Sequence, residues 1–106
     1  MTYEEAKAQL IRNDSKGWLP LLAEVFAKLP THITLTSTHN KWGGLHFDLV
    51  PRDEEFEEFL GEISERSQKI CEICGENGFF AILGSWETTV CTAHYEAFAG
   101  KKYKAE

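Results

Sequence analysis

Two short cysteine and histidine motifs in the C-terminal third constrain this chain more than any other feature. Cys71 and Cys74 are separated by two residues and followed by Gly75, which permits a tight turn, and Cys91 and His94 repeat the same gap. A two-residue gap lets both side chains of a pair point at one ion, and Zn²⁺ takes four tetrahedral sulfur or nitrogen ligands. The spacing predicts one Zn²⁺ ion held by Cys71, Cys74, Cys91 and His94.

Two other interpretations of these residues are three buried free cysteines and a redox Cys-x-x-Cys pair. The chain has three cysteines, an odd number, whereas a disulfide framework uses an even number in an oxidising compartment. No strand–helix context of the thioredoxin kind surrounds the pair. Four protein ligands leave no open position for water activation, so we expect a structural ion that contributes folding free energy directly.

The segments around the motifs predict a hairpin and a short helix. Apolar runs at 79–83 and 86–90 flank a Gly-Ser dipeptide, which is typical of a two-residue hairpin turn. A helix over 92–99 is then expected to close at Gly100 and leave a frayed lysine-rich tail. Knuckle, hairpin and helix in this order are typical of a treble-clef-like zinc finger.

The N-terminal half begins with two predicted helices. Thr2 and Glu5 have the capping-box spacing, and the first helix is expected to run to about Asn13. The second carries apolar residues at helical spacing between Trp18 and Leu29.

Two strands and a third helix follow. Residues 31–38 are rich in β-branched side chains and residues 45–49 alternate apolar with polar, so a hairpin with a turn at 39–41 is expected. The paired glycines after Trp42 suggest a bulge or close backbone approach at 42–44. Helical spacing resumes from Asp53 to Ile70. The whole predicts an α+β fold, one domain over 1–106, with a helical and hairpin part (1–70) and a zinc-finger part (71–100).

The net charge limits the classes of partner that the protein is expected to bind. The chain has 17 acidic and 11 basic residues, a formal net charge of −6. This disfavours nucleic acid and anionic lipid, which a basic surface usually binds, and favours a basic protein partner. No apolar run approaches the roughly 20 residues that span a bilayer, and the acidic N-terminus does not resemble a secretory signal, so a cytoplasmic location is expected.

Three motifs follow one another over roughly 42–94: Trp-Gly-Gly-Leu-x-Phe at 42–47, Cys-Glu-x-Cys-Gly at 71–75 and Trp-x2-Thr-x-Cys-x2-His at 86–94. In these motifs the chain resembles a group of small, largely uncharacterised bacterial and phage-encoded zinc-finger proteins. After the knuckle the relatives carry Pro-Gly and then basic residues, whereas this chain has Asn-Gly and then Phe-Phe-Ala-Ile at 77–82. The resemblance implies the fold and the metal rather than an activity.

A catalytic site is not expected. His46 and Asp48 are two residues apart on one strand, so a His–Asp pair is geometrically possible, although a solvated polar strand face is the simpler interpretation. No serine or cysteine nucleophile is recognisable beside His32, His39 or His46. The treble-clef HNH nucleases need a hairpin histidine, and 79–90 contains none. We therefore expect a non-enzymatic protein.

Two functions of different class remain. The first is a protein-binding module, most concretely an immunity or antitoxin-type inhibitor of a basic toxin or nuclease, because acids crowd the start of the third helix and Trp42 offers an anchor. A solvated helix face and a core tryptophan are the simpler alternatives. The second is a nucleic-acid-binding zinc-finger protein using Lys101, Lys102 and Lys104. The expected partner-binding residues are Trp42, Asp53, Glu54, Glu55, Glu57, Glu58 and Glu62.

Overall fold

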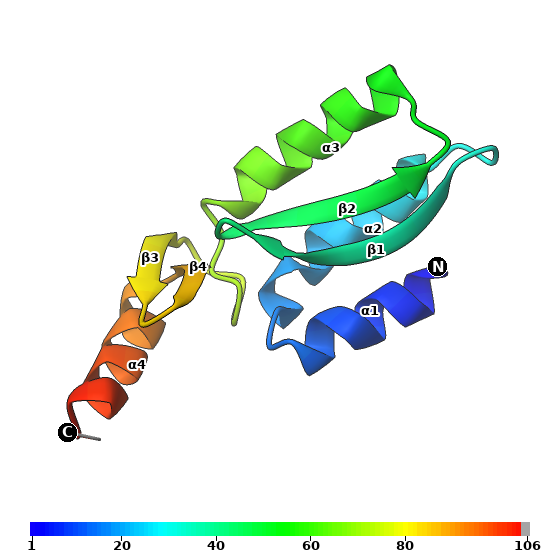
Figure 1. Ribbon diagram of the computed structural model, residues 1–106. Coiled ribbons are helices and arrows are strands. Elements are labelled where there is room, and N and C mark those ends of the chain that lie inside the picture. Colours follow the sequence, from blue (N-terminus) through cyan, green and yellow to red (C-terminus); the bar gives the residue numbers. More distant parts are fainter. Residues whose placement is uncertain (105–106) are drawn as a thin grey trace.

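The computed structural model describes the backbone of residues 1–104 and the side chains of residues 1–98 (Figure 1). Its elements, in chain order, are α1 (Tyr3–Arg12), the 3-10 helix η1 (Lys16–Trp18), α2 (Leu19–Lys28), β1 (Thr34–Lys41), β2 (Gly44–Val50), α3 (Glu54–Ser67), β3 (Phe79–Leu83), β4 (Trp86–Val90) and α4 (Thr92–Lys104). The strands form two antiparallel two-stranded sheets, β1–β2 and β3–β4. The predicted α+β class is confirmed.

The helices begin where their capping residues predict. Thr2 and Glu5 exchange side-chain and backbone hydrogen bonds in a capping box at the start of α1. The Asp53 carboxylate accepts a 2.9 Å hydrogen bond from the Phe56 N–H and so caps α3. Pro20 lies in the first turn of α2, where its missing N–H is not needed.

The larger core lies between the N-terminal helices, α3 and one face of the β1–β2 sheet. Its buried residues are Ala6, Leu10, Trp18, Leu21, Leu22, Val25, Ile33, Leu35, Leu45, Phe56, Leu60 and Ile63. A second, much smaller cluster of Cys71, Ala81 and Val90 lies in the C-terminal part. Figure 1 shows β3, β4 and α4 projecting from one end of the main body, and the molecule measures 50 × 22 × 21 Å.

The turn of the first hairpin differs from its prediction. Residues 39–41 continue β1, and the turn is Trp42-Gly43, both with positive φ (54° and 82°). That pattern suits the right-handed twist of a hairpin, but it strains any residue other than glycine. The irregularity in the pairing lies between Leu35 and Ser37 and not at 42–44. The other expectation for these glycines, a close approach of the backbone, is confirmed, because a Cβ at Gly43 would lie 2.8 Å from the Phe80 ring and 3.5 Å from the Thr88 carbonyl carbon.

The C-terminal helix also differs from its prediction. It does not close at Gly100 but runs on to Lys104, because glycine lowers helix stability without preventing helical φ and ψ. The Gly84-Ser85 turn between β3 and β4 is confirmed, with Gly84 at φ 70°. Among residues 1–104, none of the helices has the length and apolar character that crossing a bilayer requires.

Candidate metal centre

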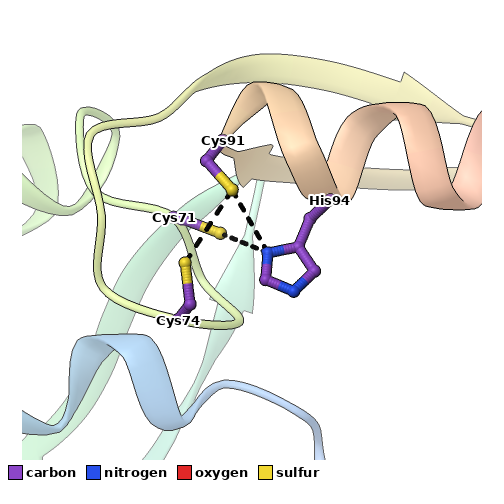
Figure 2. A group of neighbouring side chains, drawn as sticks. All are labelled: Cys71, Cys74, Cys91 and His94. Carbon is purple, nitrogen blue, oxygen red and sulfur yellow. Dashed lines mark hydrogen bonds between the residues drawn. The ribbon is translucent and has the colours of Figure 1, made fainter.

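The four residues predicted from the motif spacing come together at the base of the projecting part (Figure 2). Their ligand atoms all lie within 4.8 Å of one another. His94 Nδ1 is 3.2 Å from Cys91 Sγ and 3.6 Å from Cys71 Sγ, and the sulfur atoms of Cys74 and Cys91 are 3.8 Å apart. Ligands placed tetrahedrally at 2.0–2.3 Å from one ion are separated by roughly 3.3–3.8 Å. This cluster can hold a metal ion.

The first pair of ligands lies on a tight knuckle. The Gly75 N–H donates a 2.9 Å hydrogen bond to the Cys71 carbonyl, and the Cys71 N–H donates a 2.6 Å bond to the Glu76 carbonyl. Gly75 has φ 86°, a conformation that side chains disfavour. The predicted role of this glycine is confirmed, because the knuckle closes through it and brings both thiols to one side.

The second pair lies where β4 gives way to α4. Cys91 follows the last residue of β4, and its carbonyl accepts a 2.9 Å hydrogen bond from the Tyr95 N–H. His94 is therefore in the first helical turn, three residues on, where its ring faces back toward Cys91 (Figure 2). The β3–β4 hairpin returns the chain so that the two pairs meet.

The thiols differ in their electrostatic surroundings. Burial raises the pKa of the Cys71 thiol, but hydrogen bonds from the backbone N–H groups of Cys91, Cys74 and Ile73 outweigh it, so the net pKa is lowered. The pKa of Cys74 is raised to about 11 by desolvation and by the neighbouring sulfur atoms of Cys71 and Cys91. A bound cation supplies the positive charge that lets crowded thiols ionise together.

The knuckle packs directly on the connection between α1 and α2. The Gly17 N–H donates a 2.7 Å hydrogen bond to the Glu72 carbonyl. A Cβ atom at Gly17 would lie 2.1 Å from the Cys71 carbonyl oxygen and 2.6 Å from the Gly75 nitrogen. The N-terminal half therefore supports the site by a close backbone contact that only glycine allows.

A buried carboxylate beside the ligands was missed as a functional residue by the sequence-based reasoning. Glu72 is only 1% exposed, and its Oε1 accepts hydrogen bonds from Asn40 Nδ2 at 2.8 Å and Thr88 Oγ1 at 2.5 Å. The Ser15 hydroxyl donates to Oε2. Burial raises the pKa of Glu72, while these three donors oppose the rise. The glutamate inside the Cys-Glu-x-Cys motif was the available signal, because a charged residue is rarely buried without a role.

The expected partner-binding residues do not form one surface. Asp53 caps α3 and lies 3.3 Å from His32 Nε2, and Glu57 pairs with Arg52 at 3.1 Å. The remaining predicted acids on α3 are exposed: Glu54, Glu55, Glu58 and Glu62. Trp42 is 67% exposed, and the neighbouring Gly44 lies against Ser64 and Gln68, at the opposite end of α3 from these acids.

The histidines that the sequence raised as catalytic candidates have other contacts. His46 Nε2 is 3.1 Å from Ser64 Oγ on α3, and Asp48 accepts a 2.5 Å hydrogen bond from Ser37. His39 lies directly opposite His46 in the β1–β2 register, with the rings stacked 6.4 Å apart. The structure thus brings Asp48 to Ser37 and His46 to Ser64.

In comparisons with known proteins, no family model matches the chain, and neither a curated protein nor a solved structure matches it.

Proposed function

We propose that this protein is a non-enzymatic, zinc-stabilised protein-binding module of the cytoplasm, and most concretely an immunity or antitoxin-type inhibitor of a basic toxin or nuclease. The observation that carries the proposal is the four-ligand cluster in a chain that exposes two separate features to a partner, the acids of α3 and the Trp42 side chain. A closed cluster serves architecture rather than water activation.

Zinc is supported by the chemistry of the four ligands. Three thiols and one imidazole form a set that Zn²⁺ prefers in structural sites. Three of the distances between ligand atoms, 3.2, 3.6 and 3.8 Å, are close to the separations of a tetrahedral site. The order of knuckle, hairpin and helix start supports a treble-clef-like finger. Because the second hydrophobic cluster has three buried residues among those whose side chains are described, the ion would supply much of the local stability.

Protein binding is supported by the surface. Four acids of α3 are exposed to solvent (Glu54, Glu55, Glu58 and Glu62), and the chain carries a net charge of −6. Such a field speeds association with a basic protein. Trp42 adds a large exposed aromatic side chain of the kind that anchors interfaces.

The metal is tested first. Elemental analysis of the purified protein should find one zinc per chain, and Cys74→Ser and His94→Ala should each lose it. Glu76→Gln, a change at an exposed residue beside the knuckle, is the matched control and should retain the ion. Absence of stoichiometric zinc in the unmodified protein would contradict the proposal.

The partner is then tested with the zinc-loaded protein against basic proteins encoded beside its gene. Changing Glu54, Glu55, Glu58 and Glu62 to Gln should slow association at least tenfold at low salt. The control changes Glu4, Glu65, Glu76 and Glu96 to Gln, which alters net charge equally at other exposed positions and should have a smaller effect. Failure to bind any of these proteins, or binding to DNA or RNA alone in low-salt gel shifts, would favour the nucleic-acid alternative and overturn this one.

A further inference from the structure

We infer that the groove between the two hairpin tips, walled by Trp42 and Trp86 and bordered by Glu87, binds an arginine side chain of the partner. The inference rests on the proposed function for the basic character of that partner, and it assigns a particular site and side chain to the contact.

The groove is a distinct feature of the surface, with a volume of about 340 Å³. Asn40 and Trp42 line it from the first hairpin, and Ser85, Trp86 and Glu87 line it from the second. His39 is the basic residue of the lining, which contains neither lysine nor arginine. Glu87 is exposed, and Glu72 lies at the buried side. The groove therefore combines two large aromatic rings with acidic groups.

Trp42, which lines the groove, has a backbone conformation that is unfavourable for a bulky residue. Its φ of 54° belongs to the left-handed region, which is costly for a bulky residue, and its side chain remains 67% exposed. Strain of this kind persists only where the surroundings impose it, and it concentrates at binding sites.

Asn40 imposes that conformation and joins it to the metal centre. Its Oδ1 accepts a 3.0 Å hydrogen bond from the Gly43 N–H, which closes the turn around Trp42. Its Nδ2 donates to Glu72 Oε1 at 2.8 Å and to the Glu87 carbonyl at 3.0 Å. The two hairpins are further joined by Thr89 Oγ1, which donates a 2.7 Å bond to the Gly43 carbonyl. The two walls of the groove are thus fixed relative to each other.

The chemistry of the groove suits a planar cation. Cations bind over the face of a tryptophan ring, and Lys41 Nζ already lies 4.6 Å from the Trp42 ring centroid, although Lys41 does not line the groove. Arginine fits better than lysine because its guanidinium stacks on aromatic rings and also donates to a carboxylate such as that of Glu87.

The probe is a short glycine- and serine-flanked peptide with one central arginine, compared with the same peptide carrying neutral citrulline. Titration of the zinc-loaded, ¹⁵N-labelled protein should shift the indole N–H signals of Trp42 and Trp86 saturably. Trp18 is the internal control, because it is fully buried and its indole N–H is bonded to the Ser67 and Ile70 carbonyls at 3.1 and 3.0 Å. The citrulline peptide should bind at least tenfold more weakly.

Two variants separate a binding role from a structural one. Trp42→Gly should weaken binding of the arginine peptide at least tenfold while leaving the thermal midpoint unchanged or higher, because glycine adopts positive φ freely. Glu87→Gln should weaken binding of the arginine peptide at least threefold while the protein remains folded.

Equal binding of the citrulline peptide, shifts confined to α3, or absence of saturable shifts would overturn the inference. If the basic protein encoded beside the gene still binds the Trp42→Gly variant normally, the assignment of the groove as an arginine site fails and the proposed function stands. If neither that protein nor the peptide binds, both fail.

Discussion

At Glu72 a single carboxylate receives hydrogen bonds from three segments that are far apart in the chain. Ser15 follows α1, Asn40 belongs to β1 and Thr88 belongs to β4. The residue itself lies between two proposed metal ligands, so the metal centre and the hydrogen-bond network share one short stretch of backbone. A buried carboxylate is costly to desolvate, and its three donors offset that cost.

Replacing Glu72 by Ala should destabilise the fold by at least about 2 kcal/mol, because the change removes the carboxylate that accepts from the buried Ser15 and Thr88 hydroxyls and from the half-buried Asn40 amide. The measurement is the free energy of unfolding from urea denaturation of the zinc-loaded protein. Glu76→Ala, at an exposed neighbouring glutamate, is the control and should stay within about 0.5 kcal/mol of the unmodified chain. Equal effects of the two changes would show that the network contributes nothing.

Two glycines should respond oppositely to the same substitution. Gly17→Ala should destabilise the protein by several kcal/mol or prevent folding, since its Cβ would lie 2.1 Å from the Cys71 carbonyl oxygen. Gly61→Ala, on the exposed side of α3 with no atom within 4 Å of the new Cβ, should stabilise it by roughly 0.5–1 kcal/mol. Thermal melts of both variants check this, and a harmless Gly17→Ala would refute the close contact.

The metal ligands could be predicted from the sequence, whereas the hydrogen-bond partners of Glu72 could not, because the two depend on different separations along the chain. The spacing of Cys71 and Cys74, and of Cys91 and His94, is local, so the cluster could be predicted from adjacent positions. The partners of Glu72 lie 57, 32 and 16 residues away. No local pattern encodes such contacts, and they became visible only with the fold.

At the scale of elements, the helices and strands were predictable wherever periodicity and capping agreed. The first turn was misplaced because its Trp-Gly sequence lacks the usual Asn-Gly or Asp-Gly signal. Trp42 is held in the left-handed region by two contacts of Gly43: the local hydrogen bond to the Asn40 side chain, and the packing against Phe80, where a Cβ would lie 2.8 Å from the ring. The Phe80 contact is tertiary, so no local pattern could have predicted it.

The contact between His46 on β2 and Ser64 on α3 should make the stability of the fold depend on pH. Burial, then the nearby His39 and Lys41, lower the pKa of His46 below its usual 6.5, against a smaller opposing effect of Asp48. The unfolded chain therefore binds a proton on His46 at a higher pH than the folded chain. The stabilisation is fully present above pH 6.5 and is lost as the pH falls from there through the folded pKa.

Comparison with His46→Gln isolates this effect. The free energy of unfolding should fall more steeply between pH 7.5 and 5.5 for the unmodified protein than for the variant. The difference between the two curves excludes the other titrating groups, which both proteins share. Parallel curves would show that His46 keeps its ordinary pKa in the folded protein.

At the scale of the whole molecule, stability is unevenly distributed. Twelve buried apolar residues form the core among α1, α2, α3 and the β1–β2 sheet, whereas the cluster in the projecting part has three within residues 1–98. The two are joined by Gly17, the Glu72 network and the Thr89–Gly43 hydrogen bond. A bound ion would therefore act mainly on the part that has too little apolar burial to fold by itself.

Removing the metal with a chelator should consequently loosen one end of the molecule before the other. Hydrogen exchange measured by mass spectrometry should rise at least tenfold over residues 71–98, where the Cys71, Gly75 and Tyr95 amides now donate to backbone carbonyls. Peptides from α2 and α3 should change less than threefold, and added Zn²⁺ should restore the original pattern. A uniform rise along the chain would instead mean that the ion stabilises a single cooperative unit, because the Glu72 network would then transmit its loss to the larger core. No change at all would mean that the four ligand side chains meet without holding an ion.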